Sequence, residues 1–264
     1  MRSVSFAPPS MTPVVKALLI ANIAVFLVQM LLINGSAAQA PWEYWAALNP
    51  AAWVEHFPLV PLWQLVTYGF LHGDPMHILG NMLFLYFLGT MLEGEIGSRR
   101  FVAFYAVAIV LAGACQLFVG LALRHYNPIV GASGAVLAIV CAMATMRPQT
   151  RVIFIIVPLT LKTLALIYVS LDLFNMLMDL KHGTTGVAHF AHLAGAGFGF
   201  ASVRRGWIWR DPLQEVEGWR ERKREEQQST DEERLDALLA KISREGIHSL
   251  SPRERAFLKR VSQR

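Results

Sequence analysis

The residues of this chain that could do chemistry lie inside apolar segments. Ser133 sits in a Gly-Ala-Ser-Gly motif at the start of a short apolar stretch, and His192 lies in a later one. An earlier apolar segment carries His77 and Asn81. Polar side chains at membrane depth are costly, so they indicate function by default. A serine with a histidine predicts acyl transfer, in which the serine attacks a carbonyl carbon and the histidine takes its proton.

Each of these residues also has a common structural use. A serine at a helix start is most often an N-cap, although here the cap would lie below the membrane surface with a glycine on each side. His77 and Asn81 are four residues apart, so they share one face of a helix. They could donate hydrogen bonds to a developing oxyanion, together with the backbone N–H of Ser133, or they could bond to a neighbouring helix.

Small residues accompany both candidate reactive groups. Gly195 and Gly199 follow His192 at a small-xxx-small spacing, which allows two membrane helices to approach closely. Packing alone is a common use of this spacing, but close approach would also bring His192 to Ser133. His189, one turn earlier, could line the same cavity with a less direct role. The matching small residues on the other helix are Gly134, Ala138 and Ala142.

Composition predicts a membrane protein with a soluble tail. The chain has 264 residues, 54% of them hydrophobic and 16% charged, with a mean hydropathy of +0.40. A soluble domain would carry about 25% charged residues. After Gly206 lie 13 of the 24 Lys and Arg and 12 of the 19 Asp and Glu. The net charge of +5 therefore reflects membrane topology and does not indicate a nucleic-acid partner.

The apolar pattern predicts an all-α fold, a polytopic bundle of six membrane-spanning helices. A full crossing needs roughly 20 apolar residues, and the fourth span has only about 14, which reach about 21 Å of a ~30 Å core. It must therefore start or end below the membrane surface, which would submerge Ser133. The predicted spans are 14–34, 76–92, 101–123, 133–146, 161–178 and 187–204.

Positive charge sets the expected orientation. The connection 35–75 has no Lys or Arg, whereas basic residues follow the second, fourth and sixth spans. The positive-inside rule then places both termini in the cytoplasm and Ser133 toward the outer side.

Residues 38–40, Ala-Gln-Ala, resemble a signal-peptidase site, but the first apolar run and the leader before it are both long, so we expect a retained first span. The aromatic residues of 35–75 fit an element in the headgroup zone or an aromatic belt.

The sequence predicts three parts: a membrane domain at 1–205, a charged linker at 206–228 and a helical hairpin at 229–264. Thr230 with Glu233 reads as a capping box that starts the first hairpin helix, and Gly246 fits its end. Ser251 opens a second helix. Docking on a partner, self-association and a solvated stabilising tail are all compatible with this hairpin.

Several motifs occur together in the order found in the rhomboid intramembrane serine proteases. The resemblance covers residues 60–204 and rests on linked motifs, any one of which would be a weak signal alone. The motifs are Trp63-Gln64-Leu65, Phe70-Leu71-His72, His77-Ile78-Leu79-Gly80-Asn81, Gly89 with Glu93 and Gly97, Gly131-Ala132-Ser133-Gly134, and Ala191-His192-Leu193-Ala194-Gly195.

The resemblance implies a Ser–His dyad without a carboxylate. Ser133 would be the nucleophile and His192 the general base, while His77, Asn81 and the Ser133 N–H would stabilise the oxyanion. Glu93 would be structural, and the resemblance makes 35–75 a laterally embedded loop and 179–187 a cap over the site.

Two positions depart from the family's pattern. Leu137 stands where many members have an aromatic residue one turn after the serine, which puts the orientation of the base in doubt. Gln64 stands where an arginine is usual, which puts the anchoring of the loop in doubt.

The resulting hypothesis is a serine endopeptidase that cleaves transmembrane segments of single-span or polytopic proteins near the outer membrane boundary. It would be a multi-pass protein, expected in a bacterial cytoplasmic membrane. One alternative is an inactive rhomboid-like scaffold that binds membrane helices, although such relatives usually lose the serine or histidine. Another is an unrelated channel or transporter, which would need ionisable residues at mid-membrane and inverted repeats, and neither is clearly present. No cofactor or metal-binding motif stands out, so none is expected.

Overall fold

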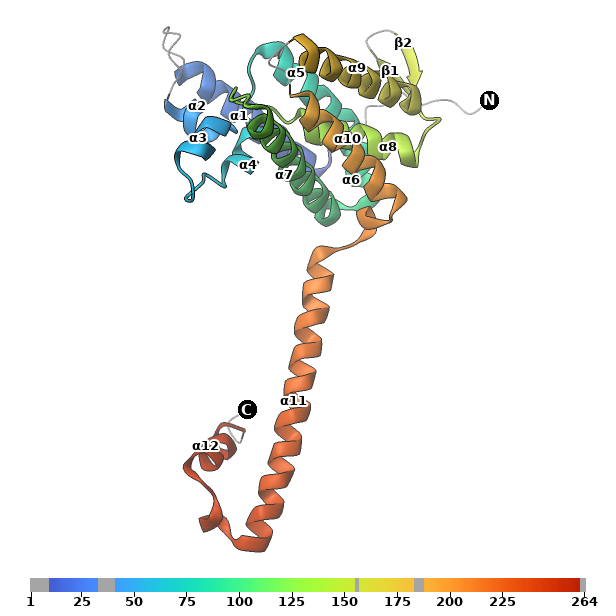
Figure 1. Cartoon of the computed structure of the whole chain (residues 1–264). Coiled ribbons are helices and arrows are strands. Elements are labelled where there is room, and N and C mark those ends of the chain that lie inside the picture. Colours follow the sequence, from blue (N-terminus) through green and yellow to red (C-terminus); the bar gives the residue numbers. More distant parts are fainter. Residues whose placement is uncertain (1–9, 33–40, 155–156, 183–187, 262–264) are drawn as a thin grey trace, which may run out of the picture. The chain divides into compact units, whose positions relative to one another are not determined.

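Two units make up the chain, Met1–Arg210 and Asp211–Arg264 (Figure 1). The structure is a computed structural model that describes residues 10–32, 41–154, 157–182 and 188–261. Within these residues, helices of the first unit match the predicted spans. They are α1 (Pro13–Leu32), the continuous α5–η2–α6 (Pro75–Phe84, Leu85–Gly89 and Thr90–Ile96), α7 (Ser98–Leu123), α8 (Ser133–Met146), α9 (Leu161–His182) and α10 (His189–Arg204).

Helix lengths agree with the predicted membrane bundle. Among the described residues, four helices are long and apolar enough to cross a membrane: α1, α5 to α6, α7 and α9. Helix α8 is apolar but has only 14 residues, as predicted for the fourth span. The first unit is therefore a helical membrane bundle with one short helix, and that helix begins at Ser133.

The short helix α8 is the centre of the bundle. Its residues from Gly134 to Met143 are all buried. Helices α8 and α10 lie side by side (Figure 1), and their mutual packing is the most extensive between any two described elements. A β-carbon at Gly195 would overlap the carbonyl oxygen of Gly134, and one at Gly199 would overlap that of Ala138. The predicted close approach of these two small-residue faces is confirmed.

The second span contains a π-helical turn, η2, between α5 and α6. Asp74 caps the start of α5, because its side chain accepts hydrogen bonds of 2.9 Å from the backbone N–H of both Met76 and His77. Pro75 at the first helical position needs no N–H partner. This cap fixes where the helix starts and so places His77 on its first turn.

Glu93 ties the second span to the first. It is buried, and its two carboxylate oxygens accept the backbone N–H groups of Val14 at 3.1 Å and Val15 at 2.9 Å. Ser98 Oγ donates a third hydrogen bond of 2.6 Å to the same carboxylate. These contacts satisfy N–H groups that the first turn of α1 leaves free. They fit the structural role expected of Glu93.

The connection before the second span is anchored by Gln64, the residue that stands where the family usually has arginine. Its side chain is fully buried; Oε1 accepts from Asn49 N and Trp53 Nε1, each at 3.1 Å, and Nε2 donates to Tyr44 O at 2.9 Å. An amide therefore supplies the anchor that the departure put in doubt. The short helices of this connection are α2 (Pro41–Ala46), α3 (Pro50–Glu55), α4 (Gln64–Thr67) and η1 (Tyr68–Phe70).

A small β-hairpin precedes α9 and was not predicted. Strands β1 (Arg151–Phe154) and β2 (Val157–Thr160) pair antiparallel, with Arg151 opposite Thr160. Pro158 lies in β2, and α9 begins at Leu161, where the predicted span 161–178 starts. The predicted cap, in part, and the signal-like residues 38–40 lie outside the described residues.

The second unit is a helical hairpin whose first helix is longer than predicted. Helix α11 runs from Pro212 to Glu245 without a break at residue 229, so it covers most of the predicted linker. The capping box at Thr230 is wrong, because Thr230 Oγ1 donates to Glu226 O at 2.8 Å inside the helix.

The rest of the hairpin follows the sequence pattern. Gly246 has a φ of +77°, which suits a glycine just past a helix end. It is followed by η4 (Ile247–Ser249) and α12 (Pro252–Val261). Leu238, Leu250 and Phe257 form a small buried core between the helices.

Candidate active site

The backbone before Ser133 is built to present its side chain at the end of a helix. Gly131 has a φ of +124°, a conformation that residues with a β-carbon rarely adopt. A β-carbon there would also lie 2.7 Å from His77 Nε2 and 3.7 Å from Ser133 Oγ. Glycine at 131 therefore lets the ring of His77 and the hydroxyl of Ser133 approach the same place.

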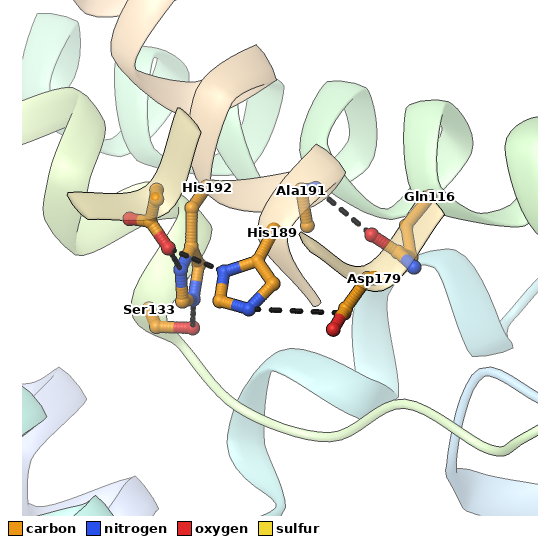
Figure 2. Close-up of polar contacts among 7 residues, drawn as sticks. Gln116, Ser133, Asp179, His189, Ala191 and His192 are labelled. Atoms are coloured by element: carbon orange, nitrogen blue, oxygen red, sulfur yellow. Dashed lines mark hydrogen bonds and ion pairs between the residues drawn. The ribbon is translucent and has the colours of Figure 1, made fainter. Parts of the chain in front are cut away.

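Ser133 is bonded to His192 and does not cap its helix. The Oγ atom of Ser133 lies 2.6 Å from His192 Nε2 (Figure 2). The N-cap position of α8 is Ala132, and its side chain makes no capping hydrogen bond. The first N–H groups of α8, including that of Ser133, therefore have no acceptor within the helix.

The backbone at the start of α10 is held by α7. The N–H of Ala191 donates to Oε1 of Gln116 at 3.1 Å (Figure 2). The N-cap residue of α10, Ala188, has no side chain that could do this. Gln116 therefore satisfies a free N–H of the first turn and fixes the turn that carries His192.

A carboxylate contacts the other ring nitrogen of His192, which corrects the expectation of a dyad without one. The Oδ1 atom of Asp172, in α9, lies 2.9 Å from Nδ1 of His192. Asp172 is 8% exposed. An ionised carboxylate only accepts hydrogen bonds, so Nδ1 carries the proton. In the neutral ring, Nε2 is then the acceptor that faces the Ser133 hydroxyl. The geometry is that of a Ser–His–Asp arrangement.

His189 shares the same carboxylate oxygen. Its Nδ1 lies 2.7 Å from Asp172 Oδ1, and its Nε2 lies 3.9 Å from Asp179 Oδ2 (Figure 2). His189 does not line the cavity of Ser133 as expected; it faces a separate cavity of about 50 Å³ on its other side. Its contacts with the reactive pair are the shared Asp172 oxygen and an edge-to-face approach to the His192 ring, with the ring centroids 6.2 Å apart.

The His–Asp–His group also has the donor types of a divalent metal site. One ligand atom each from Asp172, His189 and His192 lie within 4.8 Å of one another. The sequence motifs gave no sign of such a group, because its members are 17 and 20 residues apart. The direct hydrogen bonds already satisfy the carboxylate oxygen and both rings.

His77 and Asn81, both in α5, line the same cavity as Ser133. The Nδ2 atom of Asn81 is buried and, among the described residues, has no hydrogen-bond partner. His77 Nδ1 accepts from Gly73 N at 3.4 Å, which leaves the proton of a neutral ring on Nε2, beside Gly131. Two side-chain donors therefore face the region next to Ser133.

One cavity of about 380 Å³ joins all four predicted site residues. Ser133, His192, His77 and Asn81 line it, together with Asp172. Leu137, which replaces the usual aromatic residue, and Tyr168 of α9 are also part of its wall. The fold thus gathers a hydroxyl, a ring that can accept its proton, two side-chain donors and a space for another group. Such a site can bind a carbonyl group for acyl transfer.

Comparisons with known proteins agree with a helical membrane fold. Residues 61–207 match the family model described as Rhomboid domain. A second model, described as a family of unknown function (DUF6576), matches residues 220–264, which lie in the second unit.

Two mammalian relatives match about two thirds of the chain. The chain is 30% identical over 180 residues to the rat (Rattus norvegicus) presenilin-associated rhomboid-like protein, mitochondrial, which is 66% of this chain and 45% of the rat protein. It is 29% identical to the human (Homo sapiens) protein of that name over 180 residues, 66% of this chain and 44% of the human protein.

A bacterial relative covers a shorter part. The rhomboid protease GlpG of Klebsiella pneumoniae is 33% identical over 104 residues, 39% of this chain and 34% of that protein. This chain thus spans under half the length of the first relatives that it matches. The names of these relatives describe mitochondrial proteins, so the expectation of a bacterial cytoplasmic membrane is not supported. The protein is an integral membrane protein, and by its rhomboid domain it belongs to the rhomboid family.

Proposed function

We propose that this protein is a serine endopeptidase that cuts transmembrane segments of single-span or polytopic membrane proteins. The observation that carries the proposal is the 2.6 Å contact between Ser133 Oγ and His192 Nε2 in a cavity within a membrane bundle. A structural serine would be expected to cap its helix or bond to its own backbone. The unpartnered amide of Asn81 in the same cavity supports a reactive site as well.

The chemistry follows from the contacts. Ser133 Oγ attacks the carbonyl carbon of the scissile peptide while its proton passes to His192 Nε2. Asn81 Nδ2, His77 Nε2 and the Ser133 N–H stabilise the negative charge on the carbonyl oxygen. The peptide C–N bond then breaks, and the proton on Nε2 goes to the leaving amine. A water molecule attacks the acyl-enzyme in the second half by the same route, which releases the acid and restores Ser133.

Substrate preference follows from the hydrogen bonding of helices. A transmembrane helix buries its carbonyls in its own hydrogen bonds, so it must unwind before Ser133 can attack. Residues that weaken a helix, such as Gly and Pro, should therefore favour cleavage. We place the site toward the side of the membrane that carries the 35–75 connection, which has no Lys or Arg. Both termini lie on the opposite, cytoplasmic side, because the basic residues after the second, fourth and sixth spans gather on that side.

The test is cleavage in liposomes that hold only the purified protein and a single-span substrate with a Gly-rich outer boundary. We expect wild type to cut, and Ser133→Ala and His192→Ala to reduce the rate to background. The matched control is Ser202→Ala, because Ser202 is buried in α10 and only donates to Gly199 O at 2.9 Å. Cleavage that survives Ser133→Ala, or binding without cleavage across a substrate panel, would contradict the proposal and favour a scaffold.

A further inference from the structure

We infer that Asp172 is a positioning residue for the base of this protease: it holds His192 in the productive tautomer, and His189 holds Asp172. The inference rests on the proposed function and adds a member that the Ser–His dyad does not include. It comes from the contact of Asp172 Oδ1 with two ring nitrogens, His192 Nδ1 at 2.9 Å and His189 Nδ1 at 2.7 Å.

Burial indicates that these contacts are not incidental. Asp172 is 8% exposed and His189 is 5% exposed, so neither group is solvated as a surface carboxylate or ring would be. Ionisable side chains inside a membrane protein are costly, and they are found where they pair and serve a function. Asp179, seven residues along the same helix, is also buried and extends the group to the far side of His189.

The surroundings of His192 show why a side chain from α9 is needed. At Leu137, one turn after the serine, α8 offers no aromatic ring to stack on the imidazole. An imidazole held only through Nε2 could rotate about its own bonds or carry its proton on the wrong nitrogen. Asp172 removes both freedoms, because a carboxylate can only accept and so requires the proton on Nδ1.

The same contact acts during the reaction. When Ser133 attacks, His192 receives its proton on Nε2 and becomes an imidazolium with N–H groups on both nitrogens. Asp172 stays ionised and stabilises this positive charge without taking a proton. His189 donates to the same oxygen from the other side, so the carboxylate cannot turn away from His192.

The first test compares Asp172→Asn with Asp179→Asn, a comparison variant on the same helix that changes the far side of His189 and leaves the contact of Asp172 with His192 in place. The readouts are kcat and KM for cleavage and the rate at which a fluorophosphonate labels Ser133. We expect Asp172→Asn to lower kcat at least about 10²-fold, toward the ~10⁴-fold that a wrong tautomer costs. KM and the thermal unfolding midpoint should stay close to wild type. His189→Gln should lower kcat by less, and Asp179→Asn by least.

A second variant keeps the test decisive if Asp172→Asn unfolds. Asp172→Ala leaves room for a small carboxylate, so added formate should raise its labelling rate with increasing concentration, and Asp179→Ala should show no such response. A purely structural role of Asp172 would not produce this rescue.

Three outcomes separate the two proposals. If wild type neither labels nor cleaves, the proposed function fails. If wild type is active and Asp172→Asn keeps its kcat, only the role of Asp172 is overturned. Measurement after treatment with a chelator should give the same rates, and loss of wild-type activity on chelation would also overturn it, since the three side chains would then be metal ligands.

Discussion

Helix α10 makes two junctions of opposite kinds. Against α8 it approaches backbone to backbone, because Gly195 and Gly199 leave no β-carbon to hold the helices apart. Against α9 it meets polar side chains, with His189 and His192 both bonded to Asp172. A small-residue junction sets the distance between two helices, whereas a polar junction sets the direction and protonation of a ring.

His192 depends on both junctions at once. The first brings Nε2 within 2.6 Å of Ser133 Oγ, and the second fixes Nδ1 at 2.9 Å from Asp172. Loss of the first should therefore remove the reactive geometry and weaken the bundle, while loss of the second should leave the bundle intact and slow the chemistry. The two kinds of damage are distinguishable by measuring stability and rate together.

The largest combined loss of stability and rate is expected from Gly195→Ala. The new β-carbon would overlap the carbonyl oxygen of Gly134, so α10 must move away from α8. Overpacking of this kind costs about 1–3 kcal/mol of unfolding free energy, and a displacement near 1 Å costs about 10²-fold in rate. Thermal unfolding and cleavage in the same liposomes measure both.

Gly197→Ala is the control for this prediction. Gly197 lies on the same helix, and a β-carbon there would meet nothing within 4 Å. It should keep the wild-type rate and melt no earlier, since alanine favours a helix over glycine. A Gly195→Ala protein that cuts as fast as wild type would show that the close approach of α8 and α10 does not set the reactive distance.

A smaller effect, on rate alone, is expected from Asn81→Leu. Loss of one oxyanion donor costs about 10²-fold or more in kcat. Stability should not fall, because Nδ2 of Asn81 is buried without a partner among the described residues. Its removal also removes the free-energy cost of burying an unsatisfied donor. The control is Asn22→Leu: Asn22 is also buried in a span and outside the cavity of Ser133, its Nδ2 donates to Leu18 O at 2.7 Å, and its Oδ1 has no partner among the described residues.

Asn22→Leu should keep the wild-type rate of fluorophosphonate labelling, whereas Asn81→Leu should not. Equal kcat in wild type and Asn81→Leu would remove Asn81 from the oxyanion site. The labelling rates of the two variants thus distinguish a donor that acts in the reaction from a buried amide elsewhere in the bundle.

The small-residue junction could be predicted from the sequence, and the polar one could not. The spacing of Gly195 and Gly199 is local, and the Gly-Ala-Ser-Gly motif marks the helix that they meet. Asp172 is 20 residues from His192, and nothing in the local pattern of α9 links it to a histidine on another helix. The available signal was an ionisable residue within an apolar span, which by itself indicates function.

Two further predictions about local structure were wrong or missing, at the Thr230 capping box and before α9. Thr230 and Glu233 have the spacing of a capping box, but they stand in a run of Glu, Arg, Lys and Gln that favours helix on both sides, so α11 continues through them. The paired strands β1 and β2, residues 151–154 and 157–160, are short and mostly apolar, and such segments do not distinguish strand from helix by periodicity. In both places, the wider context decided between two allowed local structures.

The smallest effect is expected at a polar junction outside the bundle. In the second unit, Ser251 N donates to Glu254 Oε2 at 2.6 Å, and Glu254 N donates to Ser251 Oγ at 3.3 Å, a capping box at the start of α12. Lys241 Nζ lies 3.1 Å from the same carboxylate. The backbone hydrogen bond from Ser251, followed by its side chain and Lys241, lowers the pKa of Glu254 from 4.5 to about 2.

A folded-state pKa below the ordinary value means that ionised Glu254 stabilises the hairpin above about pH 4.5 and that this contribution is lost as the pH falls toward 2. Carboxyl ¹³C shifts of the full-length protein should show this titration, and Glu254→Gln should make the stability of α12 independent of pH in that window. Because the group is accessible to water, the effect on the stability of the hairpin should be small. A Glu254 that titrates near 4.5 would show that the capping box is not held in solution.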